Sequence, residues 1–299
     1  MDAAPRSSGR LALLVGLIAV STSGPFFKMA QVSAYTAVFW RTCLAGSIAF
    51  AIALARRRVR LRALLDHSAA LALSGGLLGA HFLLWVKAFE LTDYASNLIL
   101  LVVQPMFSAS IDARAGRGLP RGAALALALA ALGLALVAGG DVTLGVRALW
   151  GDAFSIVAGA MIALFYAVSR EARNALPLDV FIGVTFCCAA LVALPIALFA
   201  AVPLFDLSAR SWAWIVCLVF VTTLGGHGLM NLAARSLSLF VVNLAIVLEP
   251  LLAIGMGALL FGAQLRPLQA VGGLVLSVAV VLGLRASPPS AADAPHAIE

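Results

Sequence analysis

Charged residues are scarce in this chain. Only 11% of its 299 residues are Asp, Glu, Lys or Arg, whereas soluble domains carry about 25%. Hydrophobic residues make up 63%, and the mean hydropathy is +1.07. Apolar runs recur along the whole chain, each near the length of about 20 residues that crosses the hydrocarbon core of a bilayer. The scarcity of charge excludes a sizeable soluble domain and predicts an all-α polytopic membrane protein.

Motifs of enzymes and of nucleic-acid-binding proteins are missing as well. Without a Walker motif, ATP is not the direct source of energy, and no zinc-finger or RNA-binding signature accompanies the net charge of +7. "AGGD" at 138–141 lacks a second midplane aspartate, and no spacing pairs "STSG" with His227 as in a serine protease. The four cysteines have no metal-ligand spacing. We therefore predict no enzyme, no metal, no cofactor and no nucleic-acid partner.

Ten apolar segments are predicted as membrane spans with short loops between them. They cover 11–30, 34–55, 69–89, 93–111, 121–139, 150–169, 179–201, 212–234, 238–261 and 267–285. With the N-terminus inside, the inner segments hold 14 of the 20 Lys and Arg residues and the outer connections hold five. The positive-inside rule then places both termini in the cytoplasm. The tail 286–299 is rich in Ala and Pro and is predicted to be disordered.

The first span also has features of a signal peptide. Arg6 and Arg10 precede the apolar run "LALLVGLIAV" and the small residues "STSG". An internal repeat argues against cleavage, because it gives this span a counterpart in the middle of the chain, at 150–169.

The repeat relates the two halves of the chain. "GAHFLLWVKAFELTDYASNLILLVVQP" (79–105) aligns with "GGHGLMNLAARSLSLFVVNLAIVLEP" (225–250). Polar and helix-breaking residues pair at a nearly constant offset: His81 with His227, Asn97 with Asn243, and Pro105 with Pro250. We predict two five-span units, 1–139 and 140–285. Because five is odd, the second unit enters the membrane from the opposite side, an inverted repeat typical of secondary transporters.

Ten spans in two halves, with a proline in each fourth span, resemble the drug/metabolite transporter superfamily in its EamA-type exporter branch. The motifs are "LEP" and Pro105 in the fourth spans and Gly-rich fifth spans such as "VGGLVLSVAVVLGL". The resemblance covers about residues 10–285 and implies a ten-helix exporter of small molecules. Many members carry Gly-Glu after the ninth span; here "FGAQLRP" has Gln264 near that place, so no role of that acid carries over. "GAHFLLWVKAFELTDYASNLIL" is most similar to bacterial aromatic amino acid exporters.

Glu249 is the deepest ionisable residue of the predicted spans. It lies about ten residues, or roughly 15 Å, inside its span and precedes Pro250, which cannot donate a helical hydrogen bond. Gln104 and Pro105 repeat this helix break with a neutral amide. An ionisable residue inside a bilayer is costly and indicates function by default. Glu249 is predicted to meet the substrate or a proton; the alternative is a neutral acid packed in a kinked helix.

Other polar and aromatic residues complete the predicted cavity. His81 and Trp85 share a helix face at a spacing of four, and His227 and Asn231 repeat that spacing. The remaining cavity candidates are Asn97, Gln104, Tyr166 and Asn243. For Asn97 and Asn243, hydrogen bonds between helices are an equally good interpretation. Arg41, about 10 Å inside its span, is expected to snorkel outward; pairing with a substrate carboxylate is the less favoured alternative.

These residues predict a multi-pass transporter of the bacterial inner membrane. It would export amino acids with aromatic or large apolar side chains by alternating access, driven by the substrate gradient or by proton exchange at Glu249 or the histidines. Its partners would be the small-molecule substrate, membrane lipid and protons, and the oligomeric state is left open. One alternative is a broad drug or metabolite carrier of the same fold. Another is a lipid- or subunit-handling membrane protein without transport.

Overall fold

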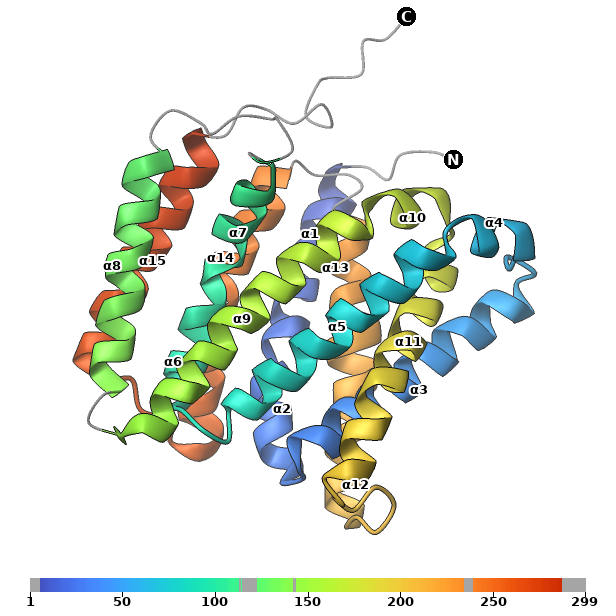
Figure 1. Ribbon diagram of the computed structural model, residues 1–299, viewed down its shortest axis with the longest axis horizontal. Helices are drawn as coiled ribbons and strands as arrows, with labels where there is room; N and C mark the ends of the chain where they lie inside the picture. The colour runs from blue at the N-terminus through green and yellow to red at the C-terminus, as the bar shows by residue number, and fades with distance from the viewer. Residues whose placement is uncertain (1–5, 113, 115–122, 142–143, 234–238, 287–299) are drawn as a thin grey trace, which may run out of the picture.

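The computed structural model describes residues 6–112, 114, 123–141, 144–233 and 239–286, and it is built of helices (Figure 1). The first half contains α1 (Arg6–Ser21), α2 (Ser23–Ala30), α3 (Ala34–Ala55), α4 (Leu61–Asp66), α5 (Ser68–Ala88), α6 (Tyr94–Leu100), the 3-10 turn η1 (Leu101–Val103), α7 (Gln104–Asp112) and α8 (Ala123–Asp141). The second half contains α9 (Val146–Val168), α10 (Arg170–Ala175), α11 (Leu178–Phe199), α12 (Ala209–Cys217), the π-helix η4 (Leu218–His227), α13 (Gly228–Ala233), α14 (Leu239–Phe261) and α15 (Pro267–Ala286). The prediction of an all-α chain is confirmed. Apart from Ala286, the predicted tail lies outside the described residues.

Several helices have the length and composition of membrane spans. Within the described residues six qualify: Gly9–Ala30, Ala34–Ala55, Ser68–Ala88, Val146–Val168, Leu178–Phe199 and Ala209–Met230. Shorter apolar helices at Tyr94–Ser108, Leu125–Asp141, Leu248–Phe261 and Pro267–Leu282 occupy the other predicted segments. The bounds agree well with the apolar runs, because a run of about 20 apolar residues satisfies its backbone in lipid only as a helix.

Polar residues in the loops set where two of the helices begin. The Ser33 hydroxyl accepts a hydrogen bond from the Tyr35 amide at 3.3 Å and caps α3. The Asp93 carboxylate accepts from the Ala95 amide at 2.9 Å and caps α6. Such caps satisfy amides that have no partner within the helix. Asp93 ends the short connection between α5 and α6, which is also where several charged residues meet.

The helices pack in pairs through small residues. α3 lies along α11, α8 lies along α15 at the opposite end of the molecule, and α5 packs between α9 and α11 (Figure 1). A Cβ added to Gly46 would lie 2.6 Å from the Cys187 amide, and one added to Gly272 would lie 2.8 Å from the Gly133 carbonyl. Backbones approach this closely only where side chains are absent, which is how helices associate in lipid.

The first and the eighth predicted spans each contain an interruption. The first is divided at Thr22 into α1 and α2, and the eighth passes from α12 through η4 into α13. The two irregular segments meet, because the hydroxyls of Thr22 and Thr222 share a hydrogen bond at 2.8 Å. π-Helical segments are rare and often accompany functional sites.

The ends of the described chain lie on one side of the bundle. The start of α1 and the end of α15 are on the same side as the short helices α4 and α10, while the end of α2 and the start of α12 are on the other (Figure 1). The connection between α5 and α6 lies on that second side, opposite the two ends.

Candidate functional site

The fourth span of each half contains one of the paired prolines. In the first half, α6 ends at Leu100, the 3-10 turn η1 follows, and α7 begins at Gln104 with Pro105 as its second residue. In the second half, α14 continues as a helix through Pro250. A proline at a helix start loses nothing, whereas one in the interior removes a hydrogen bond. The predicted helix break is therefore seen next to the proline of the first half, whereas the helix of the second half is continuous.

These two spans meet around a small cavity. Its volume is about 30 Å³, and its lining comes from both halves: Leu98, Leu101, Val102, Gln104, Glu249 and Pro250. The cavity has room for a few water molecules and is far smaller than the roughly 300–1,000 Å³ of ligand pockets. Gln104 is buried, and Glu249 is half-buried. Gln104 of the first half and the Glu249–Pro250 pair of the second half thus contribute to one site.

Arg41 extends into the interior of the bundle, so the expectation that it snorkels outward is wrong. Its side chain is 3% exposed. Nε donates to the Thr223 hydroxyl at 2.8 Å, Nη1 donates to the Ser23 hydroxyl at 3.0 Å, and Nη2 donates to His227 Nε2 at 3.3 Å. Because guanidinium groups only donate, His227 accepts at Nε2 and carries its proton on Nδ1.

The two repeat-related histidines both lie near this guanidinium. His81 Nδ1 donates to the Ala158 carbonyl at 2.9 Å, and its ring lies parallel to that of Trp85 with centroids 6.3 Å apart. His81 and Trp85 are buried, whereas His227 is half-buried. Arg41 interacts electrostatically with both histidines and with Glu249. Of the sequence-predicted residues, His227 thus bonds to Arg41, and His81 and Glu249 interact electrostatically with it.

Other predicted cavity residues have different surroundings. Tyr166 is half-buried at the end of α9, its ring packs edge-on against Phe165, and the Arg173 guanidinium lies 5.7 Å from its centroid. Burial lowers the pKa of Arg173, which is on α10 outside the spans. Asn231 and Asn243 lie on helices, but their side chains, like that of Pro105, are outside the described part of the chain.

A comparison with known proteins identifies the family. A sequence model of the EamA-like transporter family matches twice, over residues 7–139 and 149–285. The chain belongs to the EamA-like transporter family. It is therefore a multi-pass membrane protein, and its family is a family of transporters and not of enzymes. A crystal structure of a protein 18% identical in sequence has the same fold, with a TM-score of 0.64 over 94% of this chain and 99% of that one. No curated protein matches the chain.

Asn97 of this EamA-like chain joins three helices instead of facing the cavity. Its side chain is fully buried, its Nδ2 donates to the Trp85 carbonyl at 3.0 Å, and its Oδ1 accepts from the Ser155 hydroxyl at 2.7 Å. These bonds connect α6 with α5 and α9. The sequence left two interpretations of Asn97 open, cavity lining and hydrogen bonding between helices, and this arrangement is the second.

We expect Asn97→Leu to lower the free energy of unfolding by about 1–2 kcal/mol, since two buried bonds are lost at about 0.6 kcal/mol each on average in membranes and leave unpaired groups. Thermal unfolding in detergent measures the change. In a double-mutant cycle with Ser155→Ala, the two losses should not be additive. Unchanged unfolding together with lost transport would instead indicate contact with the substrate.

A second polar cluster was missed by the sequence interpretation. Asp141 and Asp152 are both buried, and the Thr92 hydroxyl lies 2.6 Å from Asp152 Oδ1 and 3.3 Å from Asp141 Oδ2. Gln269 Nε2 donates to Asp141 Oδ1 at 3.0 Å and to the Ser96 hydroxyl at 2.8 Å. The aspartate of "AGGD" thus has a second aspartate near it, but the two lie at the end of α8 and near the start of α9, not at the middle of a span. The sequence signal for this cluster was an aspartate, Asp152, at the third position of the predicted span 150–169.

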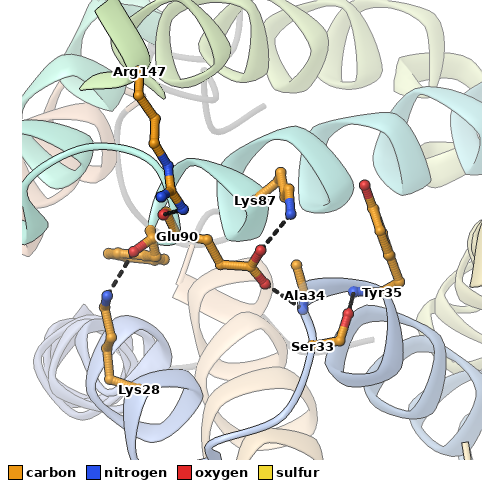
Figure 2. A network of polar contacts seen from close by, with 8 residues as sticks. Lys28, Ser33, Ala34, Tyr35, Lys87, Glu90 and Arg147 are labelled. Carbon is orange, nitrogen blue, oxygen red and sulfur yellow. Dashed lines mark hydrogen bonds and ion pairs between the residues drawn. The ribbon is translucent and has the colours of Figure 1, made fainter. Parts of the chain in front are cut away.

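Cations converge on the connection between α5 and α6 (Figure 2). Lys28 donates to the Phe89 carbonyl at 2.6 Å and Arg147 to the Glu90 carbonyl at 2.9 Å. Lys87 forms an ion pair with the Glu90 carboxylate, which also accepts from the Ala34 amide at 2.8 Å. Carbonyls at the end of α5 favour nearby cations. The network joins α2, α3, α5 and α9 on the side opposite the described chain ends.

Proposed function

We propose that this EamA-like chain is a secondary transporter with ten spans in two inverted five-span units, both termini in the cytoplasm, in a bacterial inner membrane. The packing of the helices supports the symmetry. α3 and α11, each the second span of its half, pack on each other, and so do the fifth spans α8 and α15. The third span α5 packs on the sixth span α9, and this contact is mirrored by η4 of the eighth span against α1 of the first.

The proposed substrate is an amino acid with an aromatic or large apolar side chain, which the protein exports. One observation carries this proposal: Gln104 and Glu249, from matching positions of the two halves, line one cavity between apolar side chains. Apolar walls suit the side chain of such a substrate, and the amide and carboxylate suit its polar end. The location between the halves agrees with midplane sites at the repeat interface of secondary transporters.

Transport would proceed by alternating access. A cavity of about 30 Å³ is too small for an amino acid, so the halves must move apart before substrate enters. The interrupted first and eighth spans, which meet at Thr22 and Thr222, are suited to this motion, because irregular backbone in a membrane is tolerated where it is buried or lines a cavity. The substrate gradient or proton exchange at Glu249 would drive export.

Reconstituted liposomes loaded with labelled amino acids test this proposal. We expect phenylalanine, tryptophan and leucine to leave faster than from protein-free liposomes, and threonine to leave more slowly than these three. If none of the four leaves faster than the control, export of amino acids is excluded. Efflux of unrelated cationic drugs at equal rates would favour a broad carrier, and no efflux of any solute would favour a lipid- or subunit-handling role.

A further inference from the structure

In the described part of the chain, the buried Arg41 has no carboxylate within ion-pair distance. Among the residues that the structure describes, the ion pairs within 4.0 Å are those of Arg56, Arg58 and Lys87, and no Asp or Glu oxygen comes this close to Arg41. Its hydrogen-bond partners are two hydroxyls and an imidazole. A cation held in the membrane interior without an anion is strongly disfavoured. The protein keeps it there in a fixed orientation, which points to an anion that comes from outside the chain.

The guanidinium is positioned to bind such an anion. Of its five N–H donors, three are used by Thr223, Ser23 and His227. Each of the two terminal nitrogens keeps one N–H, and these nitrogens form the fork that holds a carboxylate through two parallel bonds. Cζ of Arg41 lies over the Phe82 ring, 4.2 Å from the ring centroid, and this ring supports the guanidinium. The fork is therefore pre-oriented and only partly used.

The described part of the chain holds a second charged side chain that forms no ion pair, the carboxylate of Glu249. Glu249 lines the cavity, and no Lys or Arg nitrogen of the described residues lies within 4.0 Å of it. Arg41 and Glu249 nevertheless interact electrostatically. Two opposite charges that interact without forming an ion pair are complementary to a molecule that carries both charges.

We propose that Arg41 and Glu249 form a binding site for a zwitterion, in which Arg41 binds the carboxylate and Glu249 the ammonium group of an α-amino acid. This inference rests on the proposed export function and specifies its recognition chemistry. Thr223, Ser23 and His227 hold the Arg41 fork in place, and the apolar cavity walls between the helices receive the side chain. The site requires both charges of the ligand, so removing either one should weaken binding.

Three probes of similar shape test the inference: phenylalanine, phenylalaninamide without the carboxylate, and 3-phenylpropionate without the ammonium group. In liposomes we expect the wild type to transport phenylalanine about 10- to 100-fold faster than either analogue, the range of one charge-assisted hydrogen bond. Arg41→Gln should remove the preference for phenylalanine over its amide and retain the preference over 3-phenylpropionate. Arg41→Lys, which keeps the charge but loses the fork, should be intermediate. Arg210→Gln, an exposed arginine on α12, is the matched control.

Two results would overturn the inference. One is a wild type that moves phenylalanine and phenylalaninamide equally well, which needs no variant to be folded. The other is an Arg41→Gln protein with normal unfolding temperature and an unchanged ratio of the two fluxes. Ligand-induced stabilisation in detergent separates this inference from the export proposal. If phenylalanine stabilises the wild type but not Arg41→Gln, and no flux occurs, the site stands and the export function fails.

Discussion

We expect Glu249→Gln to reduce phenylalanine efflux from liposomes by about tenfold or more. The substitution keeps the shape of the side chain and removes its charge. A hydrogen bond to a charged group contributes about 1.5–3 kcal/mol, and each 1.4 kcal/mol is about a factor of ten. Glu249 lines the cavity beside Gln104, so the loss should appear in transport and not in folding. Flux over a range of pH, with unfolding temperature measured in parallel, tests the prediction.

The matched control uses the symmetry of the cavity. Gln104→Glu introduces a carboxylate at the corresponding place in the other half, and the double variant Glu249→Gln/Gln104→Glu exchanges the two groups. If the carboxylate matters because it faces the cavity, the exchanged protein should recover part of the lost flux. Wild-type flux of Glu249→Gln at every pH, in a fully folded protein, would show instead that Glu249 is a packed neutral acid.

The helices of this protein were predictable because the bilayer restricts them so strongly. The run 34–55 was predicted from hydropathy alone, and α3 has those bounds. Interruptions within a run were less predictable. Proline signalled the turn before Gln104, but no residue signals the division at Thr22 or the π-helix η4. Those breaks are joined by the hydrogen bond between the hydroxyls of Thr22 and Thr222. Local sequence patterns do not contain this contact, because the two segments are about 200 residues apart.

Residues of the candidate site were predictable where the internal repeat places a similar residue at the matching position of the other half. The repeat paired His81 with His227 and the fourth spans that contain Gln104 and Glu249. Arg41 had no such partner, and its depth was compatible with snorkelling. Its true direction depends on Ser23 and Thr223, hydroxyls on other helices that accept from it. Whether a charged side chain turns outward or inward is thus decided by packing partners, which single-sequence reasoning does not identify.

Two adjacent glycines on α5 should respond in opposite directions to the same substitution. A Cβ at Gly75 would collide with Cβ of Cys188 and lie 2.8 Å from the Thr185 carbonyl on α11, whereas a Cβ at Gly76 would meet nothing within 4 Å. We expect Gly75→Ala to lower the free energy of unfolding by about 1–3 kcal/mol through overpacking. Gly76→Ala should raise it by about 0.5–1 kcal/mol, because alanine favours the helix. Thermal unfolding in detergent provides both values.

Comparing Gly75→Ala with Gly76→Ala also tests whether the packing of α5 on α11 holds the site residues in position. α5 carries His81 and Trp85, so a displacement of α5 from α11 moves them relative to Arg41 on α3. Gly75→Ala should therefore reduce phenylalanine efflux even at temperatures where the protein remains folded, and Gly76→Ala should leave efflux unchanged. Equal stability of the two variants would mean that α5 and α11 are not in close contact in the membrane. A destabilised Gly75→Ala protein with normal efflux would mean that the position of His81 is not critical for transport.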